Sequence, residues 1–284
     1  MILKKLVRFL IFSNIYISLC ASALGGGSFI ILDPKNYSIP LPVILFLFCA
    51  TLFVYNFNFL FIKSHAFQSQ EKQEWIETHL TLIRLMVICS AVVISLATVY
   101  FTPPFLLLVL LPLGILSLFY SFPFKTHSFS LKKIPLLKVF LISFVWSAAT
   151  VALPAEESHH YLFSMEVVLL FIERMFFILA LAIPFDIRDY ELDKGSNILT
   201  IPGSIGVSRS KMLSVLLLLL YFGITALFEC STSILLARLA TTVLGSIIIY
   251  RIKKTSSEYY YMALIDGMMI VQSALVFIFN KLHL

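Results

Sequence analysis

Long apolar segments alternate with short polar ones along almost the whole chain. A hydrocarbon core about 30 Å thick is crossed by a helix of roughly 20 mainly apolar residues. The breaks between segments are marked by prolines and polar residues, as at Pro103-Pro104, Pro123 and Pro154 and in the stretch 186–210. The pattern predicts nine transmembrane helices, at about 9–31, 41–62, 82–101, 104–122, 135–153, 162–185, 211–229, 232–250 and 259–279.

Composition narrows the class of protein. Of the 284 residues, 60% are hydrophobic and only 13% are charged, whereas a soluble domain has about 25% charged residues. This composition excludes an ordinary soluble enzyme, a disordered chain and a secreted disulfide scaffold. The four cysteines lie singly in apolar stretches, so they indicate neither disulfides nor a zinc site. We therefore expect residues 1–284 to form a single all-α, polytopic membrane domain without internal repeats.

The basic residues are unevenly distributed. Counted with the N-terminus in the cytoplasm, 17 of the 21 Lys and Arg residues lie in cytoplasmic segments, whereas Lys35, Arg238 and Lys281 lie outside. This excess follows the positive-inside rule, so the net charge of +6 reflects topology rather than binding to nucleic acid. It predicts an integral membrane protein with its N-terminus inside and its C-terminus outside, as in a bacterial cytoplasmic membrane. Because no small-residue cleavage site follows the first apolar run, we expect that run to be a retained helix.

The densest polar stretch follows the sixth predicted helix and contains Asp186, Asp189 and Asp193. On a helix that continues past the membrane edge, spacings of three and four place all three carboxylates on one face. They would repel one another unless a cation neutralised them, and Mg²⁺ binds through carboxylates together with substrate phosphates. Arg188 and Lys194 beside them could contact the same phosphates. The alternative is a solvated, charged loop at the end of a helix.

Further residues of this stretch define a recognisable motif. The segment 186–209 resembles the second aspartate motif of the UbiA family of membrane prenyltransferases, in which three acidic or amide positions precede a basic segment, a Thr-Leu-Pro-like turn and a Gly. The matching residues after the aspartates are Thr200-Ile-Pro202, Gly206, Ser208 and Arg209. The loop 120–138 is similar to another stretch of the family through Tyr120-Ser121, Lys125 and Leu136-Leu137-Lys138.

The resemblance implies nine helices around a lateral cavity that is open to lipid. The three aspartates would be the catalytic residues at its cytoplasmic mouth, where they would bind Mg²⁺ and a prenyl diphosphate. Arg188, Lys194 and Lys125 would contact the phosphates. The implied reaction is ionisation of the allylic diphosphate, followed by attack on the carbocation by a lipophilic acceptor such as an aromatic ring or an isoprenoid.

The first aspartate motif of the family is incomplete in this chain. It should end the second helix as Asn-x-x-x-Asp-x-x-x-Asp, but Leu60 and Ser64 occupy the two aspartate positions. Asn56 matches the leading Asn and would lie across the cavity as a substrate-binding residue. Lys63 or His65 could supply basic help in place of the lost carboxylates.

Four charged residues fall within predicted helices: Glu166, Glu173, Arg174 and Asp266. An ionisable group at membrane depth is costly and usually faces a partner or a cavity. Asp266 could line the substrate cavity or make an interhelical contact. Glu166 and Glu173 lie seven residues apart, which could instead mark a polar seam in a transporter.

The sequence thus predicts Mg²⁺-dependent transfer of a prenyl group to a membrane-associated acceptor at the cytoplasmic face. Asp186, Asp189 and Asp193 would be the metal ligands, and Asp266 would join the substrate-binding residues. Two alternatives stay open. One is a catalytically silent member of the same fold that binds an isoprenoid or a partner protein, and the other is a transporter.

Overall fold

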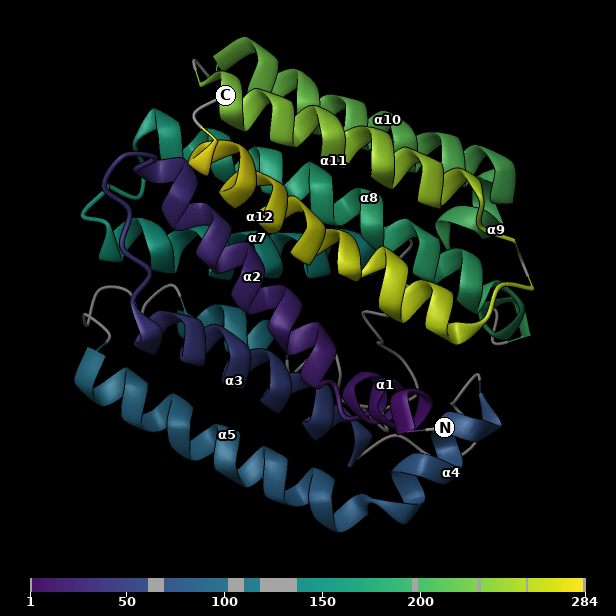
Figure 1. Cartoon of the computed structure of the whole chain (residues 1–284). Helices are drawn as coiled ribbons and strands as arrows, with labels where there is room; N and C mark the ends of the chain where they lie inside the picture. Colours follow the sequence, from purple (N-terminus) through teal and green to yellow (C-terminus); the bar gives the residue numbers. More distant parts are fainter. Residues whose placement is uncertain are drawn as a thin grey trace.

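The computed structural model is a bundle of long helices (Figure 1). It describes residues 2–60, 69–101, 110–117, 137–195, 199–228, 231–253 and 255–282, and these residues include no β-strand. Within them, eight helices are long and apolar enough to cross a membrane. The chain is an all-α, polytopic membrane protein, as the sequence predicts. The fourth predicted span, 104–122, lies outside the described residues except for 110–117, which are helical.

The helices follow one another with few long connections. The membrane-spanning helices are α2 (Ile15–Leu32), α3 (Leu41–Phe59), α5 (Leu80–Phe101), α7 (Leu137–Glu157), α8 (Met165–Gly195), α10 (Val207–Phe228), α11 (Thr232–Tyr250) and, as one span, the π-helical turn η3 (Tyr260–Ile265) with α12 (Gly267–Lys281). Three shorter helices lie at one end of the bundle, namely α1 (Ile2–Phe12), α4 (Gln70–Thr78) and α9 (Ile201–Ile205).

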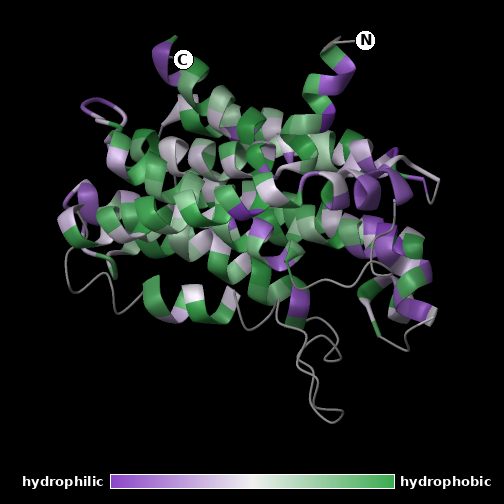
Figure 2. Cartoon of the chain, turned by 90° about the horizontal axis from the view of Figure 1, so that it is seen from below, coloured by the Kyte–Doolittle hydropathy of each residue, from purple (hydrophilic) through white to green (hydrophobic). Residues whose placement is uncertain are grey.

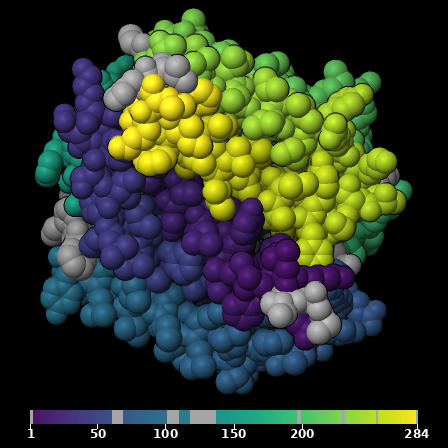
Figure 3. Space-filling model, in the orientation of Figure 1, coloured from purple at the N-terminus to yellow at the C-terminus, as the bar shows by residue number. Residues whose placement is uncertain are grey.

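Helices α2 and α8 form the centre of the bundle. Helix α2 packs against α3, α7 and α12, and α8 packs against α7 and α10, while α11 lies between α10 and α12. The N-terminal and C-terminal helices are therefore neighbours on one face, where α12 lies beside the first helices of the chain (Figure 3). Hydrophobic residues cover most of the helices, and hydrophilic residues gather mainly towards the two ends of the bundle (Figure 2).

Outer helices present apolar side chains to the surroundings. On α5, the exposed residues Leu85, Ile88, Val92, Leu96 and Val99 recur every three or four positions and form one continuous stripe. A soluble protein would not leave such a stripe in water. Its exposure is consistent with a helix that faces lipid.

The first helix differs from the prediction. The apolar run expected as a single helix over 9–31 is divided into α1 and α2 at Ser13 and Asn14. Asn14 adopts a left-handed conformation with φ of 63°, which Asn tolerates better than most residues. Asn56 holds the break from α3, because its amide oxygen accepts from the Asn14 side chain at 3.1 Å and its Nδ2 donates to the Ser13 carbonyl at 3.0 Å.

The run of three glycines in α2 allows close helix packing rather than a kink. Helix α2 continues without interruption through Gly25 and Gly27. A Cβ atom at Gly25 would come within 2.2 Å of the Leu47 side chain on α3, and one at Gly27 within 2.9 Å of the Ser273 hydroxyl on α12. The approach of α12 depends on the missing side chain at Gly27, whereas at Gly25 the nearest atom is the end of the flexible Leu47 side chain.

Pro154, predicted to mark a break, lies within a helix, and the polar segment before α5 also contains a helix. Pro154 is inside α7, close to its C-terminal end, and Pro184 is inside α8. Neighbouring helices in a membrane bundle tolerate such prolines. The polar segment before α5 contains α4, which begins where the Ser69 hydroxyl accepts a hydrogen bond from the Lys72 backbone N–H at 3.2 Å.

Candidate active site

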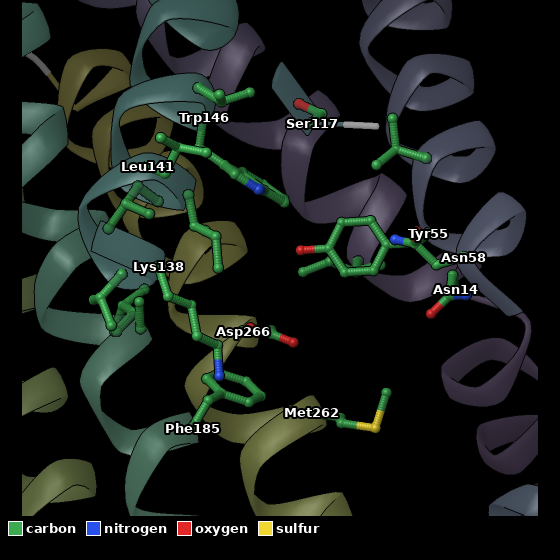
Figure 4. Close-up of a pocket in the computed structure, with 18 of the residues that line it drawn as sticks. Asn14, Tyr55, Asn58, Ser117, Lys138, Leu141, Trp146, Phe185, Met262 and Asp266 are labelled. Carbon is green, nitrogen blue, oxygen red and sulfur yellow. The ribbon is translucent and has the colours of Figure 1, made fainter. Parts of the chain in front are cut away.

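A cavity of about 420 Å³ lies between the central helices and the π-helical turn. Its polar lining comes from several elements, with Lys138 on α7 and Asp266 after η3 pointing into the same space as Tyr55 and Asn58 of α3 (Figure 4). The charged residues of the lining are Lys72, Lys138, Asp186, Arg188, Asp189 and Asp266.

The acidic face of α8 forms one wall of the cavity. Helix α8 continues to Gly195, past its predicted end at about residue 185, and places Asp186 and Asp189 one turn apart. The Lys138 ammonium lies between them, 3.1 Å from Asp186 Oδ1 and 3.8 Å from Asp189 Oδ2. The two carboxylates are therefore bridged by a cation from a neighbouring helix.

Arg188 provides the second cation on this wall. Its Nε and Nη2 donate to the two Asp189 oxygens at 2.7 and 3.3 Å. The guanidinium also lies 5.0 Å from the centre of the Phe185 ring and 6.0 Å from that of Tyr261. Contacts with aromatic faces favour a partly desolvated cation, so Arg188 is fixed at the edge of the cavity.

Asp193 and Lys194 lie further along α8, outside the lining of the cavity. One Asp193 oxygen, Oδ2, is buried and has no hydrogen-bond partner among the described residues. The structure therefore brings Asp186, Asp189 and Arg188 together at the cavity, with Asp193 one turn beyond them. The sequence-based roles of these residues remain predictions.

The acidic wall suits a metal ion that binds together with its substrate. Among the described residues, no group of three or more His, Cys, Asp or Glu side chains is arranged to hold a metal ion alone. Mg²⁺ is usually bound by one or two carboxylates and completes its shell with substrate phosphates and water. Asp186 and Asp189, which already hold a cation between them, and the unpartnered Asp193 oxygen fit that mode of binding.

Asp266 reaches the cavity from the junction of η3 and α12. Its carboxylate lines the cavity and makes no hydrogen bond or ion pair with any described residue. The π-helical turn before it, which also places Met262 in the lining, is held by Tyr16, whose hydroxyl donates to the Ala263 carbonyl at 2.8 Å. Gly267 permits this contact, because a Cβ there would lie 2.5 Å from the Tyr16 hydroxyl.

The wall opposite α8 is formed by the end of α3. Tyr55, Asn58 and Phe59 line the cavity there. Asn56, predicted to contact substrate, is fully buried and is instead hydrogen-bonded at the break between α1 and α2. Leu60, at the position of a family aspartate, follows the last residue of α3.

Lys72 extends from α4 into this side of the cavity. Its ammonium lies 3.2 Å from the Glu258 carboxylate, 3.8 Å from the Met262 sulfur and 5.5 Å from the centre of the Phe59 ring. Only 13% of the Lys72 side chain is exposed. The position of Lys72 is therefore determined by α3, by α4 and by the segment that leads into η3.

A second group of polar contacts holds α4 against α1 and against Tyr259, just before η3. Arg8 on α1 forms an ion pair with Glu71 at 3.3 Å, and the Tyr259 hydroxyl donates to the same carboxylate at 3.1 Å. Burial, followed by this hydrogen bond, raises the pKa of Tyr259 to about 12. Tyr259 therefore stays protonated as a donor, and α4 is tied to both α1 and the start of η3.

A second, more apolar cavity of about 430 Å³ adjoins the first. The two cavities share Val54, Tyr55, Ser117, Val145 and Trp146 in their linings. The second contains no charged residue in its described lining and extends between α3, α5 and α7. Together they form a site with a charged end and an apolar end.

The remaining charges within the helices do not form a seam. Glu173 forms an ion pair with the fully buried Arg238 on α11 at 2.6 Å. Arg174 donates instead to the Leu24 carbonyl and to the Ser28 hydroxyl, both at 3.1 Å. The Glu166 side chain is 75% exposed. Glu173 and Arg174 connect α8 to neighbouring helices, and in the described structure the three groups do not join Asp266 along one path.

The sequence predicts a role for Lys125 but none for Lys138 or Lys72. Lys125 lies outside the described residues, so its predicted phosphate contact stays a prediction. The sequence marks Lys138 only as part of a family-like stretch, and its position between two aspartates depends on the packing of α7 on α8. For Lys72 the sequence offers only its place in the polar segment before α5.

The fold and its apolar helices define a polytopic membrane protein, and comparison with known proteins assigns its family. The model of the UbiA prenyltransferase family matches residues 78–261, and the chain belongs to that family. No curated protein matches the chain in sequence.

Three solved structures share the fold over almost the whole chain. A UbiA homologue from Archaeoglobus fulgidus, bound to GPP and Mg²⁺, is 16% identical with a TM-score of 0.63, and the match covers 96% of this chain and 99% of that one. A structure concerned with digeranylgeranylglyceryl phosphate synthase in membranes is 15% identical with a TM-score of 0.59, covering 98% of both chains. An apo UbiA homologue from Aeropyrum pernix K1 is 12% identical with a TM-score of 0.53, covering 97% and 96%.

Proposed function

We propose that this protein transfers a prenyl group from a prenyl diphosphate to a lipophilic acceptor in the membrane and that it requires Mg²⁺. One observation carries the proposal: the paired aspartates of α8, bridged by Lys138 and joined to Arg188, lie at the charged end of a cavity whose other end is apolar. A prenyl diphosphate has the same division, with a charged head and an apolar tail. A UbiA homologue with this fold is bound to GPP and Mg²⁺.

Each wall of the cavity has a distinct part in this proposal. Asp186 and Asp189, with Asp193 beyond them, would hold Mg²⁺, which would stabilise the negative charge that develops on the departing diphosphate. Lys138 and Arg188 would donate to phosphate oxygens, because charge-assisted hydrogen bonds to phosphate are strong. Lys194 and Lys125 remain further candidates for phosphate contact.

The apolar residues would handle the hydrocarbon part of the substrate. The faces of Tyr55, Trp146 and Phe185 line the cavity and would stabilise an allylic cation through their quadrupoles. The unpartnered Asp266 carboxylate, on the same side as Lys138, would accept a hydrogen bond or a proton from the acceptor. Asn56 would act indirectly, by holding the break at Asn14, which itself lines the cavity.

The charged end of the site would face the cytoplasm. The segments at this end include the N-terminus, α4 and the end of α8, where most Lys and Arg residues gather. The positive-inside rule places such segments in the cytoplasm. We therefore propose a cytoplasmic N-terminus, an external C-terminus and, as the host membrane, a bacterial cytoplasmic membrane.

Substitution of Asp189 tests the proposal. Purified protein in detergent should bind geranyl thiodiphosphate, whose C–S bond resists ionisation, only when Mg²⁺ is present. The Asp189→Asn variant should lose this binding and should lose transfer of a labelled prenyl group into membrane lipids. Glu191→Gln, an exposed change on the same helix, serves as the matched control. Unchanged Mg²⁺-dependent binding in Asp189→Asn would contradict the roles assigned here.

A silent, isoprenoid-binding member of the family is the second candidate. The observation that favours it is the lack of aspartate at Leu60 and Ser64, where the family has carboxylates. Such a protein would bind the thiodiphosphate but would not release diphosphate from geranyl diphosphate. Restoring both carboxylates, in Leu60→Asp/Ser64→Asp, should then create diphosphate release that the native chain lacks.

A further inference from the structure

The wall opposite α8 has no carboxylate available for a second metal ion. Every Asp and Glu of the chain except Glu229 belongs to the described residues. The last described residue before Glu229 is Phe228, where α10 ends on the side of the bundle away from α9. The acidic residues near the opposite wall are already engaged, Glu71 with Arg8 and Tyr259 and Glu258 with Lys72. Carboxylates at the cavity are therefore supplied by α8 and by Asp266.

Lys72 provides a cation where that metal ion would be needed. An ammonium group has three N–H donors. Among the described residues, its polar contacts are the Glu258 carboxylate at 3.2 Å and the weakly accepting Met262 sulfur at 3.8 Å. At least one donor is left for the cavity that Lys72 lines. Lys72 and the α8 residues Asp186 and Asp189 line the same cavity, so the ammonium shares this space with the acidic wall.

The balance of charge at the opposite wall also fits one metal ion better than two. There Glu258 is already paired with the Lys72 ammonium, so the excess of carboxylates, Asp186, Asp189 and Asp193 against Lys138 and Arg188, lies on the α8 side. A site for two divalent cations needs an excess of carboxylates, because unpaired positive charges repel one another at short range. Here the added negative charge of a diphosphate can be met by a single divalent cation together with the resident cations.

We propose that the diphosphate is held by one Mg²⁺ on the α8 aspartates and by the Lys72 ammonium, which replaces a second metal ion at the opposite wall. The proposal rests on the proposed function, since it concerns the same substrate. Glu258 is a positioning residue, because its Oε1 pairs with the Lys72 ammonium, while its Oε2 is buried and has no hydrogen-bond partner among the described residues. On the α3 side, the Lys72 ammonium lies 5.5 Å from the centre of the Phe59 ring.

Counting bound metal ions tests the replacement directly. Mn²⁺ is a paramagnetic substitute for Mg²⁺, and its stoichiometry can be measured by electron paramagnetic resonance in the presence of saturating geranyl thiodiphosphate. We expect one Mn²⁺ per chain. Two tightly bound Mn²⁺ ions per chain would overturn the proposal. Failure to bind either thiodiphosphate or Mn²⁺ would instead contradict the proposed function itself, so the two failures are distinguishable.

Substitution of Lys72 provides the second measurement. Lys72→Met should weaken thiodiphosphate binding at least tenfold and leave the Mn²⁺ stoichiometry unchanged, while Lys72→Arg should retain most of the affinity. Because Lys72→Met leaves Glu258 without its cation, the double variant Lys72→Met/Glu258→Gln is measured as well and should show the same loss. Lys253→Met, an exposed lysine before η3, is the matched control. Unaltered affinity in both folded Lys72→Met variants would overturn the proposal.

Discussion

At the scale of single residues, Lys72 gives the site a pH dependence that can be measured. Burial lowers the pKa of the Lys72 ammonium, Glu258 raises it, Arg188 lowers it and Asp189 raises it, with a net decrease. Asp266 is also close enough to Lys72 for their opposite charges to attract each other. Since the charged form binds the anion, affinity should fall as pH rises, beginning at a lower pH than for an exposed lysine.

The Arg variant isolates this effect. Arginine stays protonated throughout the alkaline range, so Lys72→Arg should lose the alkaline decrease in affinity while keeping its binding near neutral pH. The measurement is the dissociation constant of geranyl thiodiphosphate, with Mg²⁺ constant, from neutral to alkaline pH. Parallel pH profiles for the native chain and Lys72→Arg would show that another group titrates.

At the scale of helices, one buried ion pair connects α8 to α11. Glu173 and Arg238 are 2.6 Å apart in the interior, and the Arg238 guanidinium also donates to the Tyr221 hydroxyl on α10 at 3.1 Å. Removing one partner of a buried pair leaves an uncompensated charge, which costs about 3–5 kcal/mol. Glu173→Gln should therefore lower the thermal unfolding temperature in detergent markedly.

Two companion variants distinguish the pair from a general effect of substitution. Replacing both partners with apolar residues, in Glu173→Leu/Arg238→Met, removes the isolated charge and should restore much of the lost stability. Glu166→Gln changes an exposed carboxylate on the same helix as Glu173, close to His160 in the preceding segment. Its effect on the free energy of unfolding should stay within about 1 kcal/mol. Equal destabilisation by Glu173→Gln and Glu166→Gln would argue against a structural role for the buried pair.

Sequence reasoning predicts helices best where one signal dominates. The apolar runs predict the spanning helices, whereas the extension of α8 from its predicted end at about residue 185 to Gly195 carries charged residues that no apolar run marks. The break at Asn14 could not be predicted, because a distant amide, Asn56, stabilises it. The π-helical turn before Asp266 likewise depends on Tyr16 from the other end of the chain.

At the scale of the whole molecule, the site arises from segments that no local pattern connects. The α8 aspartates could be found from their spacing and from the family resemblance. Lys138 reaches them through the packing of α7 on α8, and Lys72 comes to the same cavity from α4, beside the end of α3. A membrane protein has few charges, so those that packing brings together stand out once the fold is known.

The joined cavities make a further prediction about the length of the prenyl chain. Ala149 on α7 lines the apolar cavity beyond the shared residues Val145 and Trp146. Ala149→Phe should fill that space while leaving the charged end intact. Each methylene that can no longer be buried costs about 0.8 kcal/mol, so one excluded five-carbon unit should weaken binding by more than roughly tenfold. The effect should appear for farnesyl and geranylgeranyl thiodiphosphates and spare the geranyl compound.

Ala226→Phe, on an exposed position of α10, is the control. An equal loss for all three chain lengths would show that the tail does not occupy the second cavity.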